Sequence, residues 1–417
     1  MPAEYRNNAI KNIRHVALSL LSFVILYYYK EVAIMKVQHL PGAAPRLILA
    51  TFALAFAARA LAADVVIALS APTTGTDAPL ADPVVKGYKL AIKMANKEGG
   101  LPGKILESVQ DDQDKPEVGA TVARKLCGID NVVGVVGNFA SSINLASGPV
   151  YEDCHLPRVS ATASNNTLTA KGWKYFFRIC SKNSDQIGQG MQWVAANWPD
   201  VKSVAIITGN DASGREVTAQ VAQIWKDRGV RVVSQVQATP GTSDFRGIIT
   251  SMLAEKPDFI FTGMFDTDTG LFVKQARELG YKGRFFGTDA IASANFISVG
   301  GTQGTDGVHM TNLGFDPTKV ASAAAFVAAY QAEYKEAPPS YAANAYDATM
   351  VLVQAWKNAG GGVDRKAVRD ALAAKSFSTL FGPLAFSPVG DLAAPRIGIY
   401  KVAGGKIEFA AQSESSK

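Results

Sequence analysis

VVIALSAPTTG, residues 65–75, opens with five apolar residues typical of a buried strand and closes in a polar turn. The next segment, from Pro83 to Asn96, spaces its apolar residues as they occur on one face of a helix. The same succession continues at Ile105–Val109, Pro116–Leu126 and Val132–Val136. Short strands separated by helix-length segments predict right-handed crossovers and a mostly parallel sheet.

The alternation begins again after Ser181, with strands predicted at Val204–Ile207 and Phe259–Thr262. The tail departs from it, since two consecutive helices are predicted at Ala321–Tyr334 and Tyr341–Ala359. A length of 417 residues is also long for one domain. We therefore expect the α/β fold class, with two doubly wound parallel-sheet lobes in tandem.

A signal peptide is predicted at residues 35–62. A short polar stretch precedes the apolar run LILATFALAFAA at residues 47–58, which is too short to span a membrane as a stable helix. Small residues then stand at the alternating positions Ala60 and Ala62, which a signal peptidase reads. We expect export and a mature chain that begins near Ala63.

Residues 1–34 contain a second apolar run, from Val16 to Tyr29, that is again short for a membrane span. Two interpretations stay open. Translation starts at Met35 and the upstream stretch is not translated, or the stretch is a membrane anchor that survives processing. In both cases it is left out of the fold prediction.

The charge distribution argues against a nucleic-acid partner. Residues 1–62 hold seven of the 42 basic and two of the 36 acidic residues, so 35 and 34 remain from Ala63 onward, a net charge of +1. A nucleic-acid-binding domain needs a basic field to follow phosphates. The mature chain has none.

Residues for catalysis or metal binding are sparse. The mature chain has two histidines, His155 and His309, far apart in sequence, and no phosphate-binding loop or C-x-x-C motif. Asp111, Asp112 and Asp114 follow a predicted strand and are either metal ligands or solvated loop carboxylates. The second interpretation is favoured, because the spacing of a calcium loop is absent. We expect no enzyme activity, no metal and no cofactor.

Motifs distributed along the whole mature chain carry a resemblance to a known family. They are Ala71-Pro72-Thr73-Thr74-Gly75, Val109-Gln110-Asp111-Asp112-Gln113, the stretch Val136–Ser142, Tyr151-Glu152-Asp153, the stretch Val159–Ser164, Lys274-Gln275-Ala276-Arg277, Gly287-Thr288-Asp289, Phe381-Gly382-Pro383-Leu384 and Gly390-Asp391. In this order they resemble the periplasmic branched-chain amino-acid-binding proteins of ABC transporters, the type I substrate-binding fold. The match spans residues 64–410, and its specificity comes from the order of the motifs.

The resemblance implies a fold of two lobes joined by a three-strand hinge. Lobe 1 would comprise residues 63–182 plus 314–391, and lobe 2 residues 183–313 plus 392–417. It further implies a periplasmic monomer without catalytic activity. Its partners would be a small-molecule ligand, an amino acid or organic acid, and an ABC permease in the inner membrane.

Ser141 and Ser142 follow the predicted strand Val132–Val136 and open a helix, so they would face the cleft beyond the strand ends. A helix N-terminus can bind a carboxylate, because its first N–H groups are free and the positive end of the helix dipole lies there. The resemblance places a ligand-binding serine at Ser141. The alternative is that one of the two serines only caps the helix.

Thr162, Ala163 and Ser164 follow the next predicted strand. The resemblance implies that the Thr162 carbonyl accepts from a ligand ammonium and that the Ser164 hydroxyl contacts the ligand carboxylate or ammonium. The alternative is a plain turn rich in Ser, Thr and Asn.

In the second lobe, Asp289 aligns with the acidic residue that holds the ammonium in the family, and a helix N-cap is its alternative role. Phe265 stands where many relatives have an aromatic that packs on the ligand, unless it belongs to the core. Leu80 replaces a residue that is often aromatic, as does Ala212-Ser213 before Gly214. These departures favour a wider, more apolar pocket for an aromatic or longer aliphatic side chain.

Three cysteines lie in the mature region, and an exported protein permits a disulfide. Within the implied fold, Cys127 and Cys154 end two helices on one face of a sheet. We expect a disulfide between them if their Cα atoms lie within about 7 Å. Cys180 is expected to be a buried free thiol.

The preferred function is therefore the periplasmic solute-binding component of an ABC transporter for a branched-chain, hydrophobic or aromatic amino acid. One alternative is an aromatic or short organic acid as ligand, which would leave Asp289 unpaired. A sensory receptor on the same fold would require an output domain, and none is expected before Lys417. An exported enzyme is disfavoured because no nucleophile–base pair is evident.

Overall fold

The computed structural model describes residues 64–395 and 397–412. The predicted signal peptide and the stretch upstream of it lie outside the described residues. Within the described part, every helix is too short or too polar to cross a membrane.

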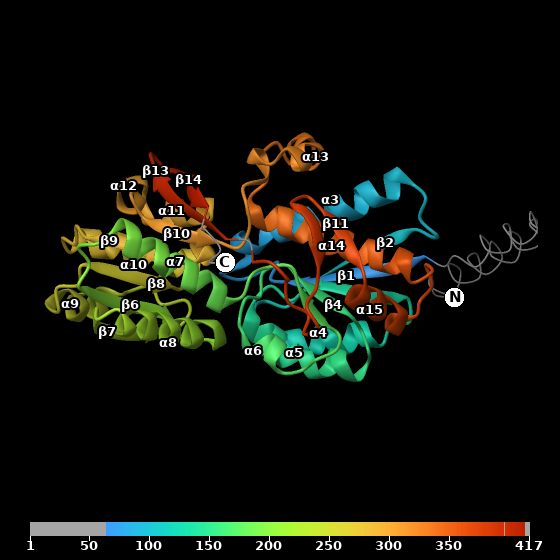
Figure 1. Ribbon diagram of the computed structural model, residues 1–417, viewed down its shortest axis with the longest axis horizontal. Helices are drawn as coiled ribbons and strands as arrows, with labels where there is room; N and C mark the ends of the chain where they lie inside the picture. Colours follow the sequence, from blue (N-terminus) through green and yellow to red (C-terminus); the bar gives the residue numbers. More distant parts are fainter. Residues whose placement is uncertain (1–63, 396, 413–417) are drawn as a thin grey trace, which may run out of the picture. The chain divides into compact units, whose positions relative to one another are not determined.

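The first sheet consists of five parallel strands in the order β2-β1-β3-β4-β5 (Figure 1). Its strands are β1 (Val65–Ala71), β2 (Ile105–Asp111), β3 (Val132–Gly137), β4 (Arg158–Ser160) and β5 (Phe176–Arg178). The helices of this half are α3 (Ala78–Glu98), α4 (Pro116–Cys127), α5 (Ser141–Asp153), α6 (Thr167–Ala170), α13 (Ala324–Tyr334), α14 (Ser340–Asn358) and α15 (Arg365–Ala374).

Helices cover both faces of the first sheet. Apolar side chains of α3, α14 and α15 pack on one face, and those of α4 and α5 pack on the other. The α3–α14 contact is close because Gly87 has no side chain, since a Cβ there would lie 2.1 Å from the carbonyl oxygen of Ala342. Burial on both faces explains why β3 is apolar or glycine at every position.

The second sheet has seven strands in the order β14-β13-β10-β9-β8-β6-β7. They are β6 (Ser203–Gly209), β7 (Arg231–Ala238), β8 (Phe259–Gly263), β9 (Arg284–Gly287), β10 (His309–Asn312), β13 (Gly398–Ala403) and β14 (Lys406–Gln412). The helices are α7 (Asn183–Asn197), α8 (Ala212–Asp227), α9 (Arg246–Ala254), α10 (Asp266–Glu278), α11 (Ala294–Gly300) and α12 (Thr302–Thr305). Side chains of α7 and α8 pack on one face, and those of α9, α10 and α11 on the other.

The second sheet is mixed rather than purely parallel. β6 to β10 pair in parallel, while β13 runs antiparallel to β10 and pairs with β14 as a hairpin. Neither β10 nor β14 was predicted from the sequence. The two-lobed α/β class is confirmed, with this antiparallel edge as an addition.

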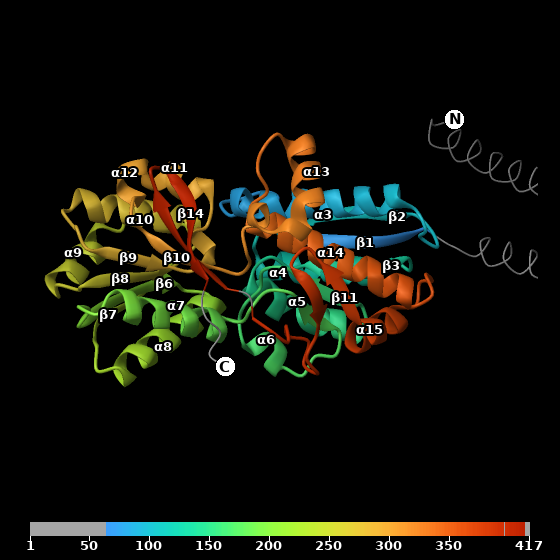
Figure 2. The same cartoon turned by 45° about the horizontal axis from the view of Figure 1, so that its top comes forward.

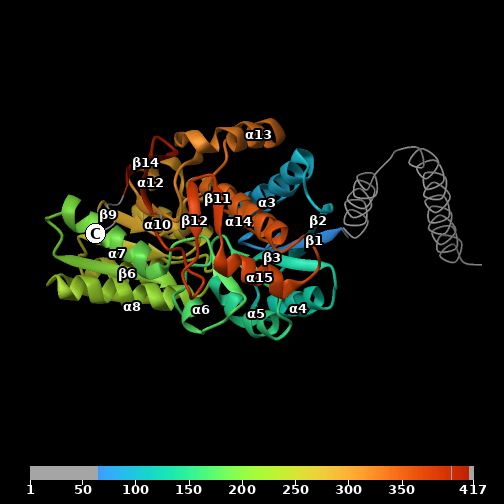
Figure 3. The same ribbon diagram turned by 45° about the vertical axis from the view of Figure 1, so that its right-hand side comes forward.

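The chain passes between the two sheets three times. The passages lie between β5 and α7, after β10, and between β12 (Gly382–Ala385) and β13. Figure 2 shows β13 and β14 returning to the second sheet after the helices α13 to α15. β12 forms a small hairpin with β11 (Ser376–Thr379) beside α14 (Figure 3). Among residues 64–395 and 397–412, none of the three passages contributes a strand to either sheet, so the described hinge consists of three connections.

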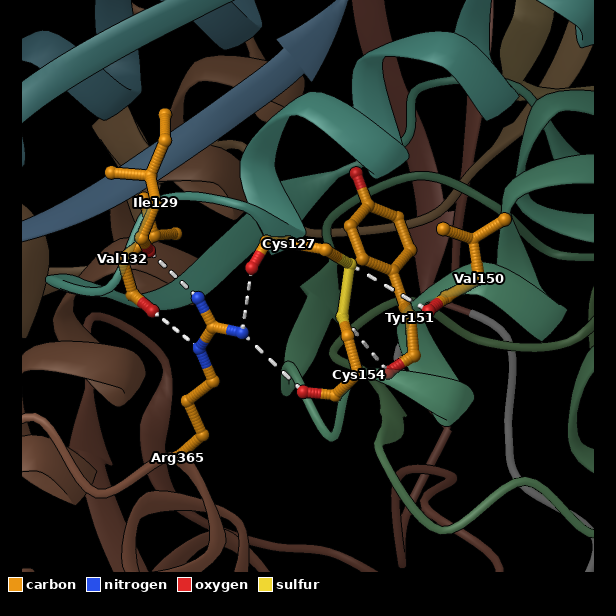
Figure 4. Close-up of a disulfide and its surroundings, with 7 residues drawn as sticks. All are labelled: Cys127, Ile129, Val132, Val150, Tyr151, Cys154 and Arg365. Carbon is orange, nitrogen blue, oxygen red and sulfur yellow. Dashed lines mark hydrogen bonds between the residues drawn. A yellow bond between two sulfur atoms is a disulfide. The ribbon is translucent and has the colours of Figure 1, made fainter.

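A disulfide joins the C-terminal ends of α4 and α5 (Figure 4). The Cα atoms of Cys127 and Cys154 lie 5.8 Å apart, within the range of ordinary disulfides. Beside it, the Arg365 guanidinium donates to the carbonyl oxygens of Cys127, Cys154, Ile129 and Val132 at 2.7–3.4 Å. Cys180 is a buried free thiol. The structure thus has the pairing and the free thiol expected from the sequence.

Candidate functional site

A pocket lies beyond the carboxyl ends of strands from both sheets, where ligands bind in open parallel sheets. Residues from loops after β3, β4, β6, β8 and β9 line it, together with residues of α7, α8 and α14. They are Phe139, Ala140, Ser141, Thr162, Ser164, Asn183, Gln186, Asp211, Ser213, Val217, Gly263, Phe265, Thr288, Asp289, Ala290 and Tyr341.

Six of the nine residues predicted from the sequence line this pocket: Ser141, Thr162, Ser164, Ser213, Phe265 and Asp289. The other three, Ser142, Ala163 and Leu80, do not. Ser142 is the second residue of α5 and points elsewhere, because neighbouring helix positions are turned by about 100°. Ala163 is buried against Leu168 in a small core cluster.

Leu80 does not line this pocket but a neighbouring groove, which shares Tyr341 with the pocket. It belongs to the first turn of α3 and is buried in the main core of the first lobe. The expectation that Leu80 widens the ligand pocket is therefore wrong. Of the two predicted departures from the family, only Ala212-Ser213 reaches the pocket, through Ser213.

Ser141 is the first residue of α5, and its hydroxyl does not cap the helix. The residue before it, Ala140, is extended and contributes no side-chain cap, so the capping interpretation is wrong for Ser141. The Ser141 Oγ accepts a hydrogen bond from the backbone N–H of Asn165 at 3.2 Å. The proton of the Ser141 hydroxyl therefore remains available for a further acceptor. The serine and the start of α5 present donors to the pocket.

The loop after β4 is tied to the loop after β3. The Thr162 hydroxyl donates to the carbonyl oxygen of Phe139 at 2.7 Å. The carbonyl of Ser164 accepts from the backbone N–H of Asn183 at 2.7 Å, at the start of α7. These bonds use the hydroxyl of Thr162 and fix the position of both loops.

Asp289 is the acidic residue at the far side of the pocket. It follows β9 as the first residue of a short 3₁₀ helix and does not cap it, so the N-cap alternative is wrong. Its carboxylate accepts hydrogen bonds from the amide Nε2 of Gln186 and from the hydroxyl of Tyr341. Burial raises the pKa of Asp289, and these two hydrogen bonds oppose the rise. Burial beside this carboxylate raises the pKa of Tyr341 as well.

The bond from Tyr341 to Asp289 joins the two halves of the molecule, since α14 packs on the first sheet and Asp289 follows a strand of the second. Neither Gln186 nor Tyr341 was predicted from the sequence as a site residue. The only sequence signal for Tyr341 was its place at the start of a predicted helix.

The second lobe also contributes a capped helix start. The Asp211 carboxylate accepts from the N–H groups of Ser213 and Gly214 at 2.7 and 2.8 Å, and burial raises the pKa of Asp211. The Ser213 hydroxyl accepts from Asn183 Nδ2 at 3.0 Å. Both Asp211 and Ser213 line the pocket.

Aromatic rings form one wall of the pocket. Phe139 lies 6.2 Å from Phe265 and 5.9 Å from Tyr341, measured between ring centroids. Phe265 is partly buried and packs against the first lobe's core from the other lobe. The wall is therefore apolar and contains residues of both lobes.

The sequence expectation of solvated carboxylates is wrong for Asp112, whereas Asp111 at the end of β2 is partly exposed and accepts a hydrogen bond from the Thr74 hydroxyl at 2.6 Å. Asp112 is fully buried and accepts from the hydroxyl of Ser70 at 2.9 Å and from Asn138 at 3.3 Å. The carboxyls of Asp114 and Asp77 hydrogen-bond to each other, and burial is the main cause that raises the pKa of both. Among residues 64–395 and 397–412, no cluster of three or more ligating side chains suits a metal.

Comparisons with known proteins agree on one family. The family model described as "Periplasmic binding protein" matches residues 64–406. The Leu/Ile/Val-binding protein homolog 3 of Brucella melitensis is 30% identical over 84% of this chain and 94% of its own length.

Two solved structures share the fold. One is the branched-chain amino acid transporter substrate binding protein LivJ from Streptococcus pneumoniae in complex with isoleucine, with a TM-score of 0.77 and 24% identity over 84% of this chain and 99% of its own. The other is a solute binding protein from R. palustris in complex with benzoate, with a TM-score of 0.76 and 21% identity over 84% and 96%.

Proposed function

This chain belongs to the periplasmic binding protein family, and we propose that it binds an amino acid with a hydrophobic or aromatic side chain. The ligand would lie in the pocket between the two sheets and be delivered to an ABC permease in the inner membrane. The protein would act in the periplasm as a non-catalytic monomer and need no cofactor.

The observation that carries this proposal is the polarity of the pocket. A serine at a helix N-terminus, Ser141, offers donors for a carboxylate, and the buried carboxylate of Asp289 offers acceptors for an ammonium. An α-amino acid carries both groups on one carbon. The aromatic wall of Phe139 and Phe265 would then receive its side chain.

We assign the contacts as follows. Ser141 binds the ligand carboxylate, and Ser164 binds the carboxylate or ammonium. The carbonyl of Thr162 and the carboxylate of Asp289 bind the ammonium, while Phe265 and Ser213 contact the side chain. Ser142, Ala163 and Leu80 are left out of this set, because they lie outside the pocket.

The boundaries of the lobes follow the two sheets. Residues 63–182 plus 314–391 would form lobe 1, and residues 183–313 plus 392–417 would form lobe 2. The strand order supports this division, because every strand of the second sheet lies in 183–313 or after 392. Residues 35–62 would direct export, and the role of residues 1–34 keeps its two interpretations.

A second ligand class is an aromatic acid without an amine, because one structural neighbour holds benzoate. A thermal-shift screen with the twenty amino acids, benzoate and 3-phenylpropanoate separates the two classes, since a bound ligand raises the unfolding temperature by mass action. We expect shifts with hydrophobic amino acids. A shift with benzoate and with no amino acid would make the organic acid the ligand.

A further inference from the structure

Gln186 has a buried amide oxygen without a partner. The residue lies in the first turn of α7, is 1% exposed and lines the pocket. Its Nε2 donates to Asp289, while its Oε1 accepts no hydrogen bond from any described residue. Leaving a buried acceptor unpaired is unfavourable, because it loses its hydrogen bonds to water, so such an oxygen is expected to have a partner in the functional state.

The described pocket residues do not offer that partner. The Tyr341 hydroxyl donates to Asp289, and the Thr162 hydroxyl donates to Phe139. The amide of Asn183 donates to Ser213 and Glu216. No Lys, Arg or His is among the described residues that line the pocket. No described residue donates to the Gln186 amide oxygen, so we expect the missing donor to come from the bound ligand.

We infer that Gln186 is a ligand-binding residue whose Oε1 accepts a hydrogen bond from the ligand's ammonium group. The inference rests on the proposed function and adds a second residue that binds the ligand's ammonium group. Gln186 and Asp289 together form an ammonium-binding site with two acceptors. The hydrogen bond from Gln186 Nε2 to the Asp289 carboxylate holds the two side chains in place. A primary ammonium has three N–H donors and can satisfy both acceptors at once.

This ammonium-binding site predicts that the protein discriminates against acids that lack an amine. Such a ligand would bury Asp289 and the Gln186 oxygen without giving either a donor. A site built for a donor rejects the analogue without it, because its buried polar groups are then left unpaired. Discrimination would therefore depend on Gln186 as well as on the charge of Asp289.

Calorimetry on the mature protein tests the inference with two matched ligand pairs. They are L-leucine with 4-methylpentanoate, and L-phenylalanine with 3-phenylpropanoate, which differ only by the amine. We expect Gln186→Met to weaken the better amino acid about ten-fold and the amine-free acid by less than about three-fold. Gln192→Met, at an exposed glutamine of the same helix, serves as the control and should leave both affinities unchanged.

A second variant separates direct binding from an effect through Asp289. In an Asp289→Asn background, Gln186→Met should still weaken the amino acid by about three-fold or more. An unchanged affinity in that background would mean that Gln186 only positions Asp289, and the inference would be overturned. A crystal structure of the wild-type complex with Gln186 Oε1 more than about 3.5 Å from every ligand nitrogen would overturn it too. Failure of the wild type to bind any amino acid would instead refute the proposed function.

Discussion

Arg178 and Asp391 form a buried ion pair, with 2.6 Å between Arg178 Nε and Asp391 Oδ1. Arg178 ends β5 just before the first passage between the sheets, and Asp391 lies near the middle of the third. The guanidinium also donates to the carbonyl oxygens of Ala163 and Asn165 and to the Thr169 hydroxyl. The pair therefore fixes two of the three connections relative to each other.

Asp391→Asn should destabilise the protein strongly. Removing one partner of a buried pair leaves an uncompensated charge and costs roughly 3–5 kcal/mol. Asp200→Asn, which breaks the exposed pair of Asp200 with Arg284, is the control and should change the free energy of unfolding very little, because solvent screens exposed ion pairs. Urea denaturation measures both, and equal losses would mean that Arg178 finds enough compensation in its carbonyl partners.

The number of free thiols should show whether the Cys127–Cys154 disulfide is formed. A thiol assay under non-reducing conditions should count one free cysteine in the unfolded protein and none in the folded protein, because Cys180 is buried. Burial also raises the pKa of Cys180 to about 12, which slows its reaction further. A count of three after unfolding would exclude the Cys127–Cys154 bond.

Replacing both Cys127 and Cys154 by Ser should lower the free energy of unfolding by roughly 3 kcal/mol, because the bond closes a loop with a sequence separation of 27. The contacts of Arg365 with the two helix ends stay in place in this variant. Denaturant unfolding of the double variant against wild type measures the loss. A loss near zero would show that Arg365 alone holds these ends together.

The two ends of the pocket should differ in their response to substitution. Ser141→Ala should weaken amino-acid binding about 10-fold, because the N–H groups at the start of α5 remain as donors. Asp289→Ala should weaken it more, since the ammonium loses its anionic partner. Ser142→Ala is the matched control and should bind as wild type, because Ser142 lies outside the pocket. Calorimetry measures the affinity of each variant for the amino acid. An unchanged affinity of Asp289→Ala would favour an organic acid as ligand.

Stability should fall as pH rises, through the carboxyl pair of Asp77 and Asp114. Burial raises the pKa of Asp114 from 3.8 to about 9, so the folded protein keeps a proton that the unfolded chain releases. This contribution is complete below the unfolded pKa of 3.8 and is lost as pH rises toward 9. Asp114→Asn should flatten the pH dependence measured by denaturation between these values. Glu117→Gln, at an exposed carboxylate, should not.

Export should remove the leader. Expressed with its own N-terminus in a Gram-negative host, the protein should accumulate in the periplasm and begin near Ala63. Mass spectrometry of the purified protein identifies its N-terminal residue directly. An intact Met1 or Met35 on the periplasmic protein would refute the predicted cleavage.

The sequence predicted the buried strands well because both faces of each sheet are covered. β3 and β8 are continuous apolar or β-branched runs, and they were recognised as such. β10, with the sequence His-Met-Thr-Asn, has no such run and was missed. It is a strand because β9 and β13 pair with it on either side, a constraint that no local pattern carries.

The site was predicted only where a residue follows its strand directly. Ser141 and Asp289 were found in this way. Gln186 and Tyr341 were not, because they reach the pocket from helices that begin beyond the first passage and in the tail of the chain. Their role depends on the distance to Asp289, which only the folded chain defines. Asp112 was misjudged for the same reason, since Ser70 of β1 and Asn138 after β3 enclose it.

The late return of the chain to the second sheet has a consequence for biosynthesis. β10 stays an open edge until β13 and β14 arrive, and these are the last strands of the described chain. If the chain is exported as proposed, the second sheet could be completed only after residues 398–412 have left the translocation channel. The order of elements would then keep the protein incompletely folded during its passage through the membrane. A truncation before Gly398 would leave β10 unpaired and open to pairing with another chain.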